Sequence, residues 1–174
     1  LYRFTRDLRL EDHAGLAAAA AAGHIVPLLV IDAEMPARPA GSPRRAASYC
    51  NAVRELDAAL RERGSHLIVR RGSASDVLRA AARDCGAGGV AWSASYDAAG
   101  VRADARLQSD LEEAGLRAAI VHDAPAIPPE ETSAERSGGS EGYRAFVPYC
   151  DVWRERVPAS YEAPLLRPFA AADL

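Results

Sequence analysis

The sequence predicts a doubly wound α/β fold, in which a five-stranded parallel sheet in strand order 3-2-1-4-5 carries helices on both faces. Short apolar runs alternate with longer segments of helical periodicity, and this alternation is typical of consecutive βαβ units. Right-handed crossovers between such units place the strands in one open sheet. The apolar runs are Leu1–Thr5, Ile25–Ile31, His66–Arg70, Gly89–Ser93 and Leu116–His122.

Four helices are predicted between these runs from their end signals. Ser42 followed by Pro43 indicates an N-cap with proline at the first helical position, and Gly64 ends the same helix. Ser73 begins a segment that resembles a capping box. Asp97 is expected to cap the last helix of the sheet domain. The predicted helices cover about 14–22, 43–63, 74–85 and 98–114, which completes a Rossmann-like domain.

The charged residues exclude several enzyme classes. All 21 basic residues are arginine, so the chain has no lysine for Schiff-base, pyridoxal-phosphate or P-loop chemistry. The net charge is -3, whereas a dedicated DNA-binding domain usually carries a basic excess. Any nucleic acid is therefore expected to be bound by another part of a larger protein.

Cysteine and histidine spacing predicts neither a disulfide framework nor a metal site. Cys50, Cys85 and Cys150 are odd in number and contain no C-x-x-C pair, which suits reduced thiols in a cytoplasmic protein. The Ala-rich run 14–22 is too short and too weakly apolar to cross a membrane. We therefore expect no metal and no membrane contact.

The loop Thr5–Asp12 is the first candidate for a binding site. In an open α/β sheet, ligands bind beyond the carboxyl ends of the strands where the strand order reverses, and here that point follows the first strand. The loop has no G-x-G-x-x-G, so the usual dinucleotide phosphate site is not expected. Arg6 and Asp7 can join ion pairs within the loop or line a cleft for a planar, polar-edged ligand, and both roles are compatible.

Several sequence motifs along the chain carry a resemblance to a known family. The first is Phe4-Thr-Arg-Asp-Leu-Arg-Leu10, and an Ala-rich helix and the strand Val26–Asp32 follow it. The next is Leu67-Ile-Val-Arg-Arg-Gly72. The last is Tyr143-Arg-Ala-Phe-Val-Pro-Tyr149 with Trp153 after it. Together these motifs span almost the whole chain, and in this order they resemble the DNA photolyase and cryptochrome family.

The resemblance implies a division of labour between two domains. Residues 1–156 would form the N-terminal α/β domain, which in that family holds an antenna chromophore, and the proline-rich stretch 157–174 would be an interdomain linker. A C-terminal helical domain would bind FAD and split flipped pyrimidine dimers in DNA. That domain is expected to be absent from this chain, so FAD, DNA contact and lyase activity would belong to the full-length protein. No catalytic residue is expected here.

The resemblance also implies which residues would line the antenna cleft. The candidates come from the loop after the first strand, the end of the second strand, the following helix and the loop after the fourth strand. They are Arg6, Asp7, Val30, Ile31, Asp32, Arg45, Ser95 and Asp97. An 8-hydroxy-deazaflavin is preferred as the chromophore over methenyltetrahydrofolate or a flavin such as FMN.

The loop Ser93–Ala99 departs from the family pattern. Many members carry a carboxylate where this chain has Ser95, which replaces a charge-assisted hydrogen bond by a neutral one. The change predicts about fivefold weaker chromophore binding. Two alternatives therefore stay open, namely a nucleotide-binding α/β module and a pigment-free structural or docking domain.

Overall fold

The computed structural model describes residues 1–32, 42–129, 132, 143 and 145–157. These residues fall into two compact units, the first of which ends at Val121 and the second of which begins at His122. The first unit holds the sheet, and the described part of the second includes the helix α6 (Phe146–Arg156).

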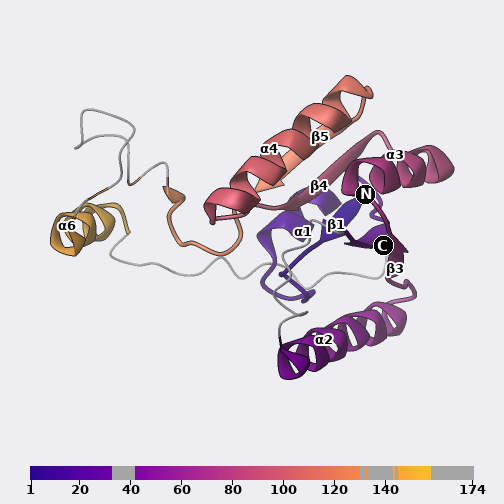
Figure 1. Cartoon of the computed structure of the whole chain (residues 1–174), viewed down its shortest axis with the longest axis horizontal. Coiled ribbons are helices and arrows are strands. Elements are labelled where there is room, and N and C mark those ends of the chain that lie inside the picture. Colours follow the sequence, from indigo (N-terminus) through magenta and orange to yellow (C-terminus); the bar gives the residue numbers. More distant parts are fainter. Residues whose placement is uncertain (33–41, 130–131, 133–142, 144, 158–174) are drawn as a thin grey trace. The chain divides into compact units, whose positions relative to one another are not determined.

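Five parallel strands form one sheet in the order β3-β2-β1-β4-β5 (Figure 1). Each predicted run overlaps one strand, and no end differs by more than two residues. The predicted fold class and strand order are therefore confirmed. The strands are β1 (Tyr2–Phe4), β2 (Pro27–Ile31), β3 (Ile68–Arg71), β4 (Gly89–Ser93) and β5 (Arg117–Val121).

The helices divide between the two faces of the sheet. Side chains alternate along each strand, so neighbouring residues of β1 and β2 enter different cores. One core joins the sheet to α1 (Ala14–Ala21) and α2 (Pro43–Glu62), and the other joins it to α3 (Ala74–Cys85) and α4 (Ala98–Glu113). The first core contains Tyr2, Phe4, Leu16, Leu29, Leu56 and Leu60, and the second contains Leu28, Val30, Leu78, Trp92, Leu107 and Leu111.

The predicted helix ends are confirmed to within one residue, but neither Ser42 at the start of α2 nor Ser73 at the start of α3 makes the predicted side-chain cap bond. Gly86 ends α3 in the left-handed region, at a φ of 68°, which glycine adopts without strain. Ser73 makes no side-chain cap bond at the other end of α3. The carboxylate of Asp32 accepts the Ala74 N–H instead, at 2.8 Å, so the cap comes from the end of β2 rather than from the adjacent serine.

The second unit contains α6 (Phe146–Arg156), on which part of the Tyr143–Tyr149 motif lies. Val152 is buried, whereas Phe146 is 76% exposed. The predicted linker lies outside the described residues, apart from Val157. No helix in the described part of the chain is long and apolar enough to span a membrane.

The first turn of α1 packs closely against the hydroxyl groups of Tyr2 and Ser93 at Gly15. An added Cβ at Gly15 would stand 2.6 Å from the Tyr2 hydroxyl oxygen and 3.2 Å from Ser93 Oγ. Both hydroxyl groups are buried and hydrogen-bonded, so neither can give way cheaply. The close approach therefore requires glycine in the first turn of the helix.

We predict that Gly15→Ala destabilises the domain by about 1–3 kcal/mol through overpacking. Without this crowding, a glycine-to-alanine change within a helix would stabilise it by up to about 1 kcal/mol. The sign of the change in unfolding free energy therefore distinguishes the two cases. Urea unfolding measures the effect. Gly88→Ala is the matched control because no atom lies within 4 Å of its added Cβ. A stabilised Gly15→Ala chain would contradict the close packing.

Candidate functional site

The candidate site lies at the carboxyl edge of the sheet, between the loops that follow β1 and β4. These two strands are adjacent, with Arg3 in register with Trp92. Helices α1 and α2 cover one face of the sheet, and α3 and α4 cover the other. The strand order therefore reverses between β1 and β4. This is the place where open α/β sheets bind ligands.

The Asp7 carboxylate is buried at this edge, where it accepts hydrogen bonds from other groups of the protein. Its Oδ2 accepts hydrogen bonds from the hydroxyl groups of Tyr2 and Ser93, each at 2.7 Å. Its Oδ1 accepts from the backbone N–H of Thr5 at 2.8 Å and from the Thr5 hydroxyl at 3.2 Å. The role in a cleft predicted for Asp7 therefore does not fall to its carboxylate, and its backbone carbonyl already accepts the Arg9 N–H at 2.7 Å.

His13 completes the buried network. Its Nε2 lies 3.0 Å from Asp7 Oδ2, and its Nδ1 accepts the Leu16 N–H at 3.3 Å, so the side chain caps α1. A ring nitrogen that accepts a hydrogen bond carries no proton, which places the proton of the neutral ring on Nε2. His13 therefore donates to Asp7 while it accepts from α1.

The network sets the ionisation of Asp7. Burial alone would raise the pKa of this carboxyl, but hydrogen bonds from His13, the Thr5 N–H, Ser93 and Tyr2 outweigh it and hold the pKa far below its ordinary value. The group is therefore a carboxylate throughout the physiological range. Tyr49 of α2 approaches the same loop, where its hydroxyl donates to the Thr5 carbonyl at 3.3 Å. Burial, with the charge of Asp7 adding to it, raises the pKa of Tyr49 to about 12.

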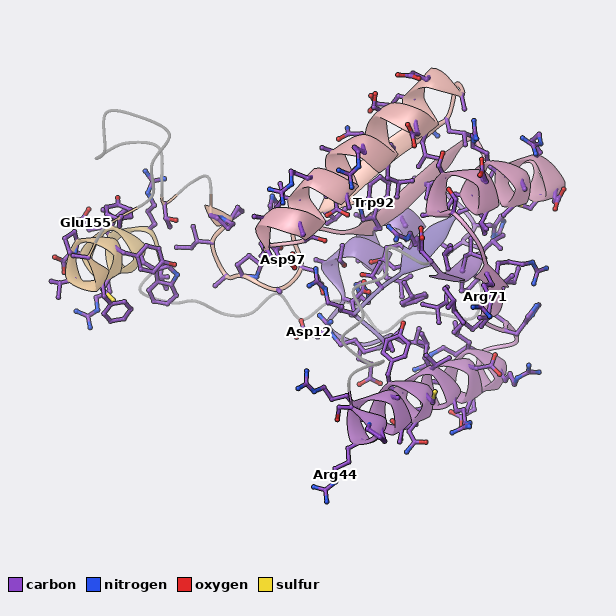
Figure 2. All side chains as sticks on the ribbon, viewed as in Figure 1. Asp12, Arg44, Arg71, Trp92, Asp97 and Glu155 are labelled. Atoms are coloured by element: carbon purple, nitrogen blue, oxygen red, sulfur yellow. The ribbon has the colours of Figure 1, made fainter. Side chains whose placement is uncertain are left out.

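Arg6 and Asp97 meet above this network, at the surface. The Arg6 Nη1 lies 3.1 Å from Asp97 Oδ2, and the two side chains are 49% and 43% exposed. Asp97 also caps α4 as predicted, because its Oδ1 accepts the Gly100 N–H at 2.9 Å. Figure 2 shows Asp97 at the start of α4. The pair thus joins the two loops that flank the switch point.

A second buried carboxylate fixes the loop after β4. Asp104 of α4 accepts from Trp92 Nε1 at 3.0 Å and from the Ser95 N–H at 2.7 Å. The side chain of Ser95 packs against Gly100, where an added Cβ would lie 2.5 Å from Ser95 Cβ. Ser95 is therefore held by its backbone and its packing together.

The remaining predicted residues do not join this group. Val30 is buried in the core, and Asp32 caps α3. Ile31 is 43% exposed at the end of β2. Arg45 is exposed in the first turn of α2, and no hydrogen bond or ion pair connects it to the part of the chain that the structure describes.

Sequence reasoning missed Tyr2, His13, Ser93 and Asp104 as members of the site. Two of them carried a usable signal. His13 directly precedes the Ala-rich helix, where a capping side chain is expected. Asp104 precedes Leu107 and Leu111 at helical spacing, and this spacing places its carboxylate on the buried face of α4.

An open groove beside α3 and α4 is a different feature. It contains more acidic than basic side chains and none of the predicted site residues, so it does not suit an anionic pigment. It is lined by Ser73, Ser75, Asp76, Arg79, Asp110, Glu113 and Ala114. In the described part of the chain, no group of His, Cys, Asp and Glu is arranged to hold a metal ion.

Comparisons with known proteins agree with the fold. The family model for DNA photolyase matches residues 1–168. The chain is 35% identical to the deoxyribodipyrimidine photo-lyase of Streptomyces griseus, over 92% of this chain and 36% of the relative. It is 32% identical to that of Halobacterium salinarum, over 99% of this chain and 38% of the relative. The chain therefore spans a little over a third of the length of these relatives.

A solved structure agrees as well. The archaeal photolyase from Sulfolobus tokodaii, described with two FAD molecules and as implying a novel light-harvesting cofactor, superposes with a TM-score of 0.66. The sequences are 27% identical over 74% of this chain and 30% of that one.

We predict that Asp7→Ala destabilises the domain by about 2–4 kcal/mol, because it leaves three buried side-chain donors without their acceptor. Asp110→Ala, the same change on the exposed face of α4, is expected to stay within about 0.5 kcal/mol of the wild type. Urea unfolding at neutral pH measures both. Equal losses of unfolding free energy in the two variants would show that the hydrogen bonds of Asp7 add no more stability than an exposed aspartate does.

The lowered pKa of Asp7 predicts acid sensitivity with a definite sign. Its contribution to stability is complete above the ordinary aspartate pKa of about 4 and is lost as the pH falls toward the lower pKa of the folded state. Wild-type unfolding free energy should therefore drop between about pH 5 and pH 2 more steeply than that of Asp7→Asn. Parallel curves for the two proteins would contradict the assignment.

Proposed function

The chain belongs to the DNA photolyase family, and from that premise we propose that it is the N-terminal α/β domain that holds a light-harvesting antenna chromophore. The observation that carries the proposal is the half-exposed Arg6 beside Asp97 at the switch point of the 3-2-1-4-5 sheet. Planar guanidinium groups suit the polar edge of an aromatic pigment.

The residues at this edge fit such a group chemically. Arg6 and Arg45 would supply cationic donors, and Ile31 would supply exposed apolar surface. Asp7 would act through its backbone, while Asp32, Ser95 and Asp97 would shape the walls; Val30 lies in the core and does not face the cleft. When bound, the chromophore absorbs light and passes excitation to a second pigment by dipole coupling. The protein's own task is then to hold it rigidly, which a buried network beneath the loops favours.

The activity of the whole protein is part of the proposal. We infer that residues 1–156 form the antenna domain and that 157–174 begin a linker to a C-terminal helical domain. That domain would bind FAD and repair pyrimidine dimers in DNA as a carbon-carbon lyase in the cytoplasm. The 174-residue chain alone would have no catalytic residue. Among antenna chromophores we favour an 8-hydroxy-deazaflavin over methenyltetrahydrofolate or FMN.

A pigment-free docking domain is the second candidate. It is favoured by the Arg6–Asp97 pair, in which each charge already has an opposite charge at 3.1 Å. A nucleotide-phosphate site is opposed by the buried, ionised Asp7 beneath the first loop, because it would repel a phosphate group.

We predict that the purified chain binds 8-hydroxy-deazaflavin and that Arg6→Ala or Arg45→Ala weakens binding by about tenfold or more. Each variant removes a charge-assisted hydrogen bond, and fluorescence anisotropy during titration measures the affinity. FMN and methenyltetrahydrofolate are titrated in parallel to test the choice of chromophore.

Arg102→Ala, at an exposed position of α4, serves as the control and should bind as the wild type does. Absence of binding to all three chromophores would favour the pigment-free domain. Unchanged binding after both arginine substitutions would overturn the proposed cleft.

A further inference from the structure

Arg3 lies where a parallel sheet normally has an apolar residue. It is the middle residue of β1, the central strand, and it is in register with Leu28 on one side and Trp92 on the other. Because Tyr2 and Phe4 enter the core beneath α1 and α2, Arg3 extends toward the opposite face, which α3 and α4 cover. Central strands covered on both faces are usually continuous runs of apolar residues.

The guanidinium of Arg3 is incompletely satisfied. Its Nε is buried and has no hydrogen-bond partner. Burial lowers the pKa of Arg3, while four groups near it raise that pKa: Asp104, Asp32, Asp7 and Tyr49. Within the described residues, none of the four forms an ion pair or a hydrogen bond with Arg3.

The two carboxylates that raise the pKa of Arg3 most, Asp104 and Asp32, already accept hydrogen bonds from other groups. Asp104 binds the Trp92 indole N–H and the Ser95 backbone N–H. Asp32 binds the Ala74 N–H at the start of α3. Neither can move to Arg3 without releasing a backbone group that it satisfies. The acids therefore provide a favourable field for the cation but do not complete its hydrogen bonds.

The position of these acids shows which end of the sheet Arg3 approaches. Asp7 follows β1, Asp32 follows β2, and Asp104 holds the loop after β4. All three belong to the carboxyl edge, where the candidate site lies. Arg3 is only partly buried as a whole, so solvent still reaches the side chain beyond its Nε.

We propose that Arg3 is a ligand-binding residue of the antenna site, and that a carbonyl oxygen of the chromophore accepts hydrogen bonds from its guanidinium. This inference rests on the proposed function and adds a residue to it. A guanidinium stays charged even when buried, so an unmade donor costs free energy that a purely structural residue has no reason to carry. A methionine of similar length would fill the same space without that cost.

The ligand role predicts opposite effects of Arg3→Met on stability and on binding. The melting temperature of the unliganded chain should stay the same or rise by a few degrees, because the substitution removes an unsatisfied buried charge. The affinity for 8-hydroxy-deazaflavin should fall by about tenfold or more. Thermal unfolding and fluorescence anisotropy of the 174-residue chain give the two values.

Two further variants make the test specific. Arg3→Lys keeps the positive charge beside Asp32 and Asp104 but removes the planar fork, so it should fold normally and still bind more weakly. Arg83→Met makes the same change on the exposed last turn of α3, at the other end of that helix from Asp32. It should leave the affinity unchanged.

The outcomes separate this inference from the proposed function. If the wild type binds none of the three chromophores, the proposed function fails and this inference fails with it. If the wild type binds and Arg3→Met binds equally well, only the role of Arg3 is overturned, and an ordered water would satisfy its Nε. If Arg3→Met lowers the melting temperature by several degrees, Arg3 is a structural brace for Asp32 and Asp104 and the inference is wrong.

Discussion

The buried carboxylate of Asp7 is the interaction on which the domain most depends. It receives hydrogen bonds from the first strand through Tyr2, from the start of α1 through His13 and from the end of β4 through Ser93. One charged group thus fixes a strand, a helix and a neighbouring strand at the edge where ligands bind. A buried ion is stable only when its lone pairs are satisfied, so all of these elements must be in place together. The absence of a side chain at Gly15 follows from the same requirement, because the Tyr2 hydroxyl occupies that space.

This arrangement divides the charged groups into buried carboxylates that stabilise the fold and arginines at the edge that the proposed function assigns to a ligand. The carboxylates of Asp7, Asp32 and Asp104 serve internal donors, whereas Arg6 is half-exposed at the rim. Arginine is the only basic residue type in the chain, and it offers a planar fork rather than a point charge. Under the proposed function, a carbonyl-bearing pigment would be met by guanidinium groups at this edge. Asp97 holds Arg6 directly, whereas the buried acids are engaged with other donors.

The fold was predictable from the sequence because its signals are local. Apolar runs of strand length, Gly86 at the end of α3 and Asp97 at the start of α4 each depend on a few neighbouring residues, and topological rules then give the strand order. The site was predictable only in part. The Arg6–Asp97 pair joins residues 91 positions apart, and both had been assigned to the site without their contact. Asp7, Ser73 and Arg3 show the limit, since their roles depend on which way a side chain points in the assembled sheet. The Ala74 N–H at the start of α3 is capped by the carboxylate of Asp32, 42 positions earlier in the chain. No local pattern around Ser73 indicates that acceptor.

Composition explains why binding and stability should be coupled in this domain. Alanine fills 38 of the 174 positions, so bulky apolar side chains are few and α1 contributes only one of them, Leu16, to the core. A domain with less apolar burial per residue has a smaller hydrophobic contribution to stability. Hydrogen-bonded networks around Asp7 and Asp104 then matter more, and they stand next to the ligand edge rather than at the opposite end of the sheet. A ligand that satisfies Arg3 or Arg6 would extend those networks, and by mass action it would stabilise the folded state by an amount that grows with the logarithm of the ligand concentration divided by its Kd. Under the proposed function, chromophore binding is therefore expected to stabilise the same edge of the sheet that the Asp7 and Asp104 networks hold together.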